Sequence, residues 1–278
     1  MKAPIRFALV LSVLALFCAV TAPATPITIT DITPGTAIND GVVNPGEYVG
    51  ASSGINGGFG DVLGGASLLH IDSDTLGNLS LGHVAGNPAS GLNDVGVMYI
   101  DSVAGGFVDT TGFADLQNIL SQGISATDGA LNADLTFAPG FQADYALAWD
   151  VNGALLYQLA NGGNGSMPFV ANANLTPAGN ALNAQWEMNL TMANLGLAPG
   201  GSFNYVVTYL NPGTGSMFRS DEFHGVAPAT VPGGNIGTNP FALAGGDFNT
   251  FTSVVPEPST LAFLGLGLFI CARFLRRR

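Results

Sequence analysis

Between residues 27 and 209 the chain alternates apolar and polar residues in short segments bounded by Gly, Asn, Asp and Pro. A period of two residues is typical of β-strands with one buried face. The clearest segment, residues 185–192, places Trp186, Met188, Leu190 and Met192 on one face and polar residues on the other. The pattern predicts about eight to ten strands, mostly antiparallel, in a β-sandwich. The other predicted strands are residues 27–32, 66–71, 79–84, 95–100, 143–150, 154–160 and 203–209.

One segment, residues 113–122, has the period of a helix instead. Its apolar side chains recur three and four positions apart, which predicts a single short helix in a mainly β protein. Thr110 or Thr111 is the expected N-cap, and Gly123 is the expected end. The predicted apolar face consists of Phe113, Leu116, Ile119 and Leu120.

The first 24 residues have the pattern of a signal peptide. Lys2 and Arg6 precede an apolar run over residues 7–20, and Ala22 and Ala24 supply the small-x-small pattern that signal peptidase recognises. We expect cleavage after Ala24. The apolar run is too short to remain as a membrane anchor.

The last residues form a second apolar segment with a basic end. Residues 261–275 carry one charge, Arg273, and three further arginines follow. A helix of this length rises about 22 Å at ~1.5 Å per residue, which is short of the roughly 30 Å hydrocarbon core of a bilayer. Local thinning of the bilayer and snorkelling arginines allow it to insert. The arginines favour the cytoplasmic side, so the rest of the chain is expected to face outward.

This end resembles the PEP-CTERM sorting signal of exopolysaccharide-producing Gram-negative bacteria. The resemblance covers residues 255–278 and includes the proline-rich motif, a transmembrane helix over about residues 260–275, and the basic end. It implies processing by exosortase, a membrane-embedded enzyme, after transient anchoring in the inner membrane. Release to the outer cell surface or the extracellular matrix would follow. The motif residues are Val255, Pro256, Glu257, Pro258, Ser259 and Thr260.

Composition divides the chain between these two ends. Residues 25–224 hold the predicted β-sandwich domain, in which residues 50–65 form a glycine-rich loop with little to bury. Residues 225–254 shift to Gly, Pro, Asn and Thr, which predicts a spacer between the domain and the anchor. The expected order is therefore signal peptide (1–24), domain, spacer and sorting signal (255–278).

Positive charges lie almost entirely at the two ends. Arg219 is the only Lys or Arg in residues 25–257, a stretch that holds all 19 acidic residues, so its net charge is −18. Nucleic acid and anionic lipid surfaces are excluded as partners, because binding them requires clustered Lys and Arg. Cys18 and Cys271 also lie in the ends, so the body forms neither a disulfide nor a thiolate metal site.

Two segments of the body resemble DOMON-like sandwiches, a group that includes family 9 carbohydrate-binding modules. One is residues 186–197 followed by Ala-Pro-Gly-Gly at 198–201. The other is Asp40-Gly41 followed by Glu47-Tyr48, which is similar to an opening "DG…E-aromatic" element. The resemblance implies a ligand-binding sandwich. The aromatic residues that clamp sugars in that group have no matched positions in this chain.

Two sets of residues are candidates for metal binding. Asp72, Asp74 and Asn78 carry oxygen ligands at a spacing reminiscent of a calcium loop, although the terminal bidentate Glu is missing. An Asx-rich turn is the alternative. His70 and Asp72, with His224 much later, have the ligand types of a non-haem iron triad. Nothing basic follows His224 before the tail to hold an acidic co-substrate, and a half-buried strand histidine is the alternative.

Aromatic and acidic residues of the strands are the remaining candidates. Trp149 and Trp186 would stack on sugar rings if their faces lined a groove, and their spacing favours a place in the core. Asp221 and Glu222 are adjacent on a strand and point to opposite faces, so they cannot form a catalytic pair by themselves. Arg219 is expected to be a structural partner for a carboxylate or a strand-end carbonyl.

The sequence therefore predicts an exported, non-catalytic component of the cell envelope or matrix, with exopolysaccharide as the partner it suggests. An extracellular hydrolase acting on polysaccharide is the alternative, with acids such as Glu187 or Glu222. Apart from calcium, no cofactor is expected, because the chain lacks nucleotide-binding glycine patterns, nucleophile elbows and zinc motifs.

Overall fold

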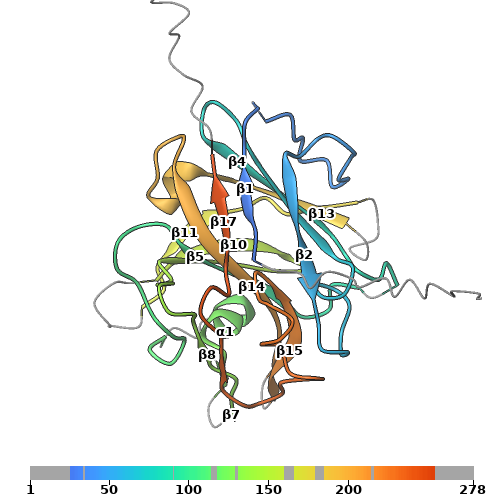
Figure 1. Ribbon diagram of the computed structural model, residues 1–278, viewed down its shortest axis with the longest axis vertical. Helices are drawn as coiled ribbons and strands as arrows, with labels where there is room; N and C mark the ends of the chain where they lie inside the picture. Colours follow the sequence, from blue (N-terminus) through green and yellow to red (C-terminus); the bar gives the residue numbers. More distant parts are fainter. Residues whose placement is uncertain are drawn as a thin grey trace, which may run out of the picture.

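The computed structural model describes residues 26–33, 35–89, 91–113, 118–128, 131–159, 166–178, 185–213 and 216–253. These residues form a mainly antiparallel β fold with one α-helix, as the sequence predicted (Figure 1). Most strands belong to one 13-stranded sheet, in which β11-β10-β9-β5-β14-β15-β2-β3-β4-β13-β12 are successive neighbours. The strands of this sheet are β1 (Thr28–Thr30), β2 (Gly50–Ile55), β3 (Leu68–Ser73), β4 (Asn78–Val84), β5 (Val95–Asp101), β9 (Tyr145–Asp150), β10 (Gly153–Gln158), β11 (Phe169–Asn172), β12 (Thr176–Pro177), β13 (Gln185–Thr191), β14 (Ser202–Gly213), β15 (Ser216–His224) and β17 (Asn249–Thr252).

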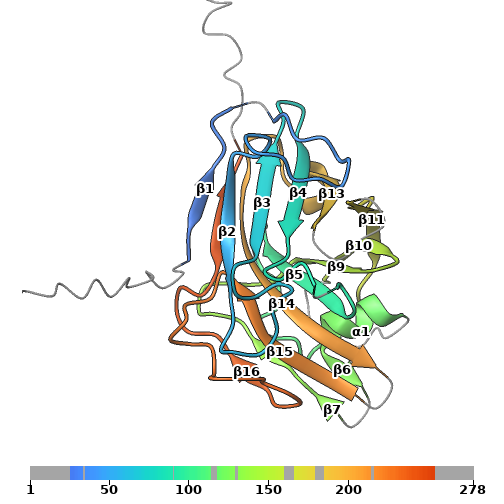
Figure 2. The same ribbon diagram turned by 90° about the vertical axis from the view of Figure 1, so that its right-hand side faces the viewer.

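Strand β2 is where the sheet turns back on itself. The end of β2 pairs with β15, with Gly54 opposite His224, and its beginning pairs with β3, with Gly50 opposite Ile71. The two halves of the sheet pack against each other while they stay hydrogen-bonded through β2 (Figure 2). A single curled sheet thus replaces the two separate sheets of a standard sandwich.

The first core fills the space between the two halves. Strand β13 contributes the stripe that its alternation predicted, and Trp186 is fully buried there. Trp149 of β9 lies against the backbone of Gly96, where an added Cβ would come within 2.3 Å of its indole ring. Only glycine fits beneath that ring. The largest side chains of this core are Trp149, Trp186, Tyr205, Phe203 and Phe251.

The second core lies on the opposite face of β5, β9 and β14. It is covered by α1 (Ile119–Ser125) and by segments that include the short pairs β6 (Thr127–Asp128) with β7 (Leu131–Asn132), and β8 (Leu135–Thr136) with β16 (Phe241–Ala242). Because β9 is buried on both faces, the positions between Tyr145, Leu147 and Trp149 are alanines rather than polar residues, and even Asp150 at its end is buried. The sequence predicted a strand here but not its second buried face.

The helix begins and ends later than predicted. Its N-cap is Asn118, whose side chain accepts hydrogen bonds from the backbone of Leu120 and Ser121, and Ala126 ends it in the left-handed conformation. Gly123 lies inside the helix and does not end it. It packs closely against β5, since an added Cβ would come within 2.8 Å of Val95. Leu116 lies outside the described residues. Ile119, assigned to the apolar face, is 46% exposed.

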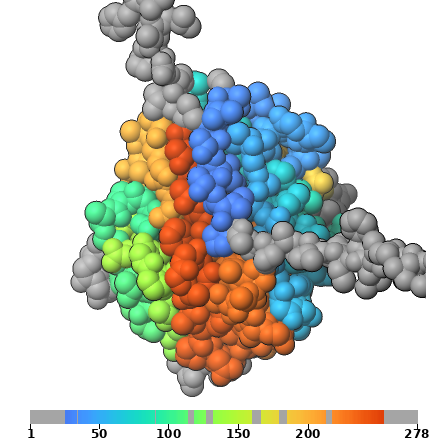
Figure 3. Space-filling model, in the orientation of Figure 1, coloured from blue at the N-terminus to red at the C-terminus, as the bar shows by residue number. Residues whose placement is uncertain are grey.

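The predicted spacer is part of the fold. Strand β17 pairs with β14 on one side and, in parallel, with β1 on the other. Phe251 is completely buried, and Asn249 accepts a hydrogen bond from the backbone of Ile27 at 2.8 Å. Figure 3 shows these first and last described segments side by side on one face. Composition was a poor guide here, because a four-residue strand supplies the buried contacts.

The glycine-rich segment 50–65, predicted to be a loop with little to bury, contains a strand and buried side chains. Its first six residues form β2, and the rest bury Val62 and Leu63 in the first core. No helix in the described part of the chain is long and apolar enough to cross a membrane. The predicted signal and transmembrane helices lie outside the described residues.

Candidate functional site

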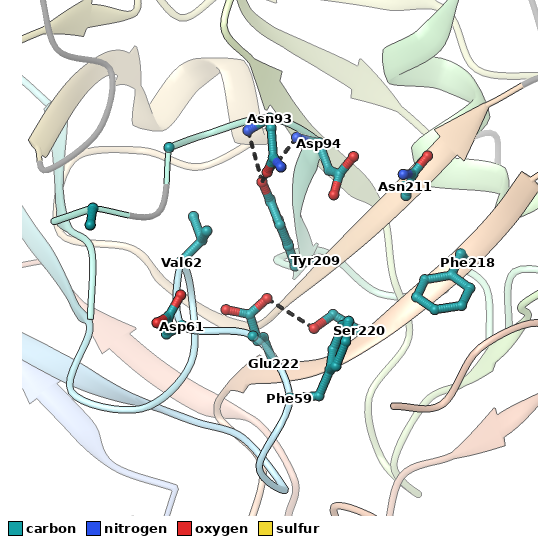
Figure 4. A pocket seen from close by; sticks show the side chains of 13 residues that line it. Phe59, Asp61, Val62, Asn93, Asp94, Tyr209, Asn211, Phe218, Ser220 and Glu222 are labelled. Carbon is teal, nitrogen blue, oxygen red and sulfur yellow. Dashed lines mark hydrogen bonds between the residues drawn. The ribbon is translucent and has the colours of Figure 1, made fainter. Parts of the chain in front are cut away.

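An open pocket of about 420 Å³ lies beside β14 and β15 (Figure 4). Strand β14 contributes Tyr209 and Asn211 to it, and β15 contributes Phe218 and Glu222. The remaining wall comes from the loop after β2 and the segment before β5. The curl of the sheet at β2 brings these parts together. Its polar and aromatic side chains include Phe59, Asp61, Asn93, Asp94, Ser220 and Glu222.

Glu222 supports the wall of this pocket. Its Oε1 accepts hydrogen bonds from the backbone of Leu63 at 2.9 Å and Gly64 at 3.0 Å, and its Oε2 accepts one from the Ser220 hydroxyl at 2.9 Å. Burial raises the pKa of Glu222, and these hydrogen bonds act in the opposite direction. With both oxygens engaged, Glu222 fixes the loop 60–64 to β15.

Asp221 fixes the same loop from the other face of β15. Its Oδ2 accepts hydrogen bonds from the backbone of Gly57 at 2.7 Å and of Phe59 at 3.0 Å. Phe59 is held by this contact at the mouth of the pocket, where its ring is 46% exposed and lies edge to face with Phe218 at 6.2 Å.

Tyr209 fixes the segment that carries Asp94. Its hydroxyl oxygen accepts hydrogen bonds from the backbone of Asn93 at 3.2 Å and Asp94 at 2.9 Å, and its hydroxyl donates to Oδ1 of Asn93 at 3.0 Å. The Asp94 carboxylate itself accepts no hydrogen bond from the described residues, and burial raises its pKa. The pocket therefore contains one carboxylate that is held in place by its backbone and is free to bind.

The second candidate acid, Glu187, joins two distant segments. It is fully buried, and its Oε2 accepts hydrogen bonds from the backbone of Asp40 at 2.9 Å and Gly41 at 2.7 Å. Its Oε1 accepts one from the Tyr48 hydroxyl at 2.5 Å. Gly41 has a φ of +88° and no room for a side chain, since a Cβ would come within 2.3 Å of the Pro177 carbonyl oxygen. Glu187 thus fastens the loop 40–48 over the sheet.

The residues of the iron hypothesis are not brought together. His224 is fully buried, with Nδ1 3.1 Å from the Ser52 hydroxyl and Nε2 3.2 Å from that of Ser67. His70 is half-buried near Tyr48, with the ring centroids 5.4 Å apart. Within the described ranges, no group of three or more His, Cys, Asp or Glu side chains could hold a metal ion. The half-buried strand histidine is the better description of His70.

The predicted calcium residues line one small polar cavity of about 230 Å³. Asp74 accepts hydrogen bonds from the backbone of Leu76 and Asn78 at 2.8 Å and from the Asn78 side chain at 2.6 Å. Asp72 lies behind them and accepts from the backbone of Thr36 at 3.2 Å, and burial together with Asp31 raises its pKa to about 6. This arrangement favours the Asx turn over a calcium site, because Asp74 and Asn78 already satisfy each other.

The tryptophans and the arginine have structural roles. Trp149 and Trp186 are completely buried in the first core, so neither ring can reach a ligand, and the sugar-stacking hypothesis is wrong for both. Arg219 is buried in the second core and donates to the Ala133 carbonyl at 2.9 and 3.1 Å and to the Thr208 hydroxyl at 2.8 Å. The carbonyl partner matches one of its two predicted roles.

Of the pocket residues, the sequence analysis singled out Glu222 but missed Phe59 and Asp94. Phe59 lies in a glycine-rich loop and Asp94 in a turn before β5, and no local period connects them with Tyr209. An isolated Phe in a stretch of glycines is the one signal that could have indicated an exposed aromatic residue.

The C-terminal end of the chain matches a known sorting motif. Residues 254–278 match the family model of the PEP-CTERM protein-sorting motif. The motif indicates an exported protein with a C-terminal membrane-anchoring signal that exosortase processes. The match includes the six predicted motif residues at 255–260, which lie outside the described residues, as do Ala22 and Ala24 of the predicted signal-peptidase site. The comparison with curated proteins gave no match.

Proposed function

We propose that this protein is a non-catalytic component of the outer cell surface or extracellular matrix, retained there by binding exopolysaccharide. The sorting motif supports the destination, because exosortase processing belongs to exported proteins. After signal peptidase and exosortase have acted, the folded body is the part that persists outside the cell. The body does not bind nucleic acid, because it has many acidic residues and only one Arg to contact phosphates.

The non-catalytic role rests on Glu187 and Glu222, the two acids that a hydrolase would use, because hydrogen bonds within the fold already occupy both of them. Glycoside hydrolysis usually requires two carboxyl groups that face each other across the scissile bond, about 5 to 9.5 Å apart. Glu187 accepts three hydrogen bonds from the loop 40–48. Glu222 accepts two from the loop 60–64 and one from Ser220 on its own strand. In the described part of the pocket, Asp61 also accepts a hydrogen bond, from Asn87 at 2.7 Å. Asp94 alone stays unengaged, and one carboxylate is not a catalytic pair.

The proposal includes a ligand-binding body of the DOMON-like type. The two segments that carry this resemblance, residues 40–48 and 186–197, are joined through Glu187. Glu187 of the late segment holds the opening element in place against the sheet. This contact supports the resemblance at the level of the fold.

Binding and hydrolysis are separated by one experiment on the purified exported protein. It is incubated with insoluble and soluble polysaccharides, and the bound fraction and the release of reducing ends are measured together. We expect retention on at least one polysaccharide with no release of reducing ends above the buffer blank. Retention on none would refute the binding role, and sustained release that is lost in the Asp94→Ala variant would establish the hydrolase instead.

A further inference from the structure

The pocket beside β14 and β15 has the features of a preformed ligand site. Its volume of about 420 Å³ lies within the range of small-ligand sites, roughly 300 to 1,000 Å³. Such sites combine apolar or aromatic walls with a few fixed polar groups. Here Phe59 and Phe218 supply the aromatic wall, while Asn93, Asp94 and Asn211 supply polar side chains (Figure 4).

Buried residues behind the pocket fix its two ends. Asp221 holds the backbone of Phe59, and Tyr209 holds the backbone of Asp94. Both supporting residues lie on the central strands β14 and β15 and are buried. The backbone segments that carry the aromatic ring and the carboxylate are therefore already in place, so little backbone entropy is lost on binding.

The charge of the lining selects the class of ligand. Among the described residues that line the pocket, three are acidic and none is Lys, Arg or His. Arg219 is next to Phe218 in sequence, but its side chain points into the second core and binds Ala133 and Thr208. A uronate or sulfated sugar would place its anion beside Asp94 without any counter-charge, which is unfavourable.

We propose that this pocket binds an uncharged pyranose unit of the matrix polysaccharide, with the ring face on Phe59 and hydroxyl groups donating to Asp94. The amides of Asn93 and Asn211 offer both donors and acceptors to the remaining hydroxyls. The C–H face of a pyranose is apolar and its edge is polar, which matches an aromatic ring beside a carboxylate and amides. This inference rests on the proposed polysaccharide-binding function and assigns it to one place.

The test measures binding of short oligosaccharides to the purified exported protein by calorimetry. The probes are neutral oligomers of glucose and of mannose, oligogalacturonate of the same length, and deacetylated chito-oligosaccharide. The variants are Phe59→Ala and Asp94→Ala, with Phe169→Ala as the matched control. Phe169 is 59% exposed and lies on β11, an end strand of the sheet that is separated from β15 by β10, β9, β5 and β14.

We expect at least one neutral oligomer to bind, oligogalacturonate not to bind, and each pocket variant to lose about tenfold or more in affinity. The Phe169→Ala variant should retain wild-type affinity. The Asp94 carboxylate accepts no hydrogen bond from the described residues, so its replacement should leave the melting temperature unchanged and report on binding alone.

Four results would overturn the inference. Wild-type affinity in both pocket variants would place the polysaccharide elsewhere and leave the proposed function standing. Preference for oligogalacturonate would contradict the exclusion of anionic sugars by the acidic lining. Binding of chito-oligosaccharide alone that disappears in high salt would show that the net negative charge, rather than the pocket, selects the ligand. Binding of none of the probes, together with no retention on any polysaccharide, would refute the proposed function itself.

Discussion

Replacing Glu187 with alanine should destabilise the fold severely. The substitution removes the acceptor of two backbone N–H groups and of the Tyr48 hydroxyl, all on a loop that crosses the sheet. An unsatisfied buried donor costs roughly 1 to 3 kcal/mol. Water can reach the Asp40 side of the loop more easily than Gly41, so we expect a total loss of about 3 to 5 kcal/mol.

The Glu187→Gln variant separates hydrogen bonding from charge. The amide oxygen can accept from Asp40 and Gly41, and the amide nitrogen can donate to the Tyr48 oxygen, so the loop stays fastened. The buried charge is removed at the same time, which offsets part of the loss, because burial raises the pKa of Glu187. We expect this variant to lose about 1 kcal/mol or less.

Urea unfolding followed by tryptophan fluorescence measures both effects, since Trp149 and Trp186 are buried in the core. Glu47→Ala is the control, because the hydrogen bonds of Glu47 lie in the exposed part of the same loop. It should cost less than about 1 kcal/mol. If Glu187→Ala and Glu47→Ala had equal midpoints, the role assigned to Glu187 would be wrong.

Three further predictions concern protonation, calcium and backbone geometry. Burial lowers the pKa of His224 to about 3, while the unfolded chain titrates near 6.5, so the stability from its neutral form is lost as pH falls below 6.5, by about 2 kcal/mol at pH 5. The raised pKa of Asp72 acts in the opposite direction. Comparing the melting temperatures of wild type and His224→Gln at pH 7 and pH 5 isolates the histidine. Between these pH values the melting temperature of the variant should fall less than that of wild type. Adding millimolar calcium should leave the melting temperature unchanged, because Asp74 is satisfied within its turn; a rise that Asp74→Ala abolishes would restore the calcium site. Gly41→Ala should cost more than about 2 kcal/mol in urea unfolding, since a Cβ has no room beside Pro177, and an unchanged midpoint would contradict this geometry.

Strands with one buried face were the part of the fold that sequence could predict. The alternation in residues 185–192 identified the buried stripe of β13 correctly, because the opposite face of β13 is only partly covered. Where both faces are buried, as in β9, alternation predicted the strand but assigned only half of its contacts. Length and composition failed for β17, since Phe251 anchors a strand of four residues in a glycine-rich segment.

The pocket could not be predicted in the same way. Its residues depend on the curl at β2, which places Phe59 near Phe218 although 159 positions separate them. Acidic residues misled the analysis for a related reason. Glu187 and Glu222 have the residue type of catalytic acids, but only the loops that bind them reveal that they hold the fold together.

The parallel pairing of β1 with β17 bears on the order of events during export. In a chain exported from its N-terminus, residues 28–30 would cross the membrane long before residues 249–252, their neighbours in the sheet. The seam between them cannot close while the chain is still threading through the membrane. The β1–β17 seam would therefore be among the last parts of the sheet to form during export.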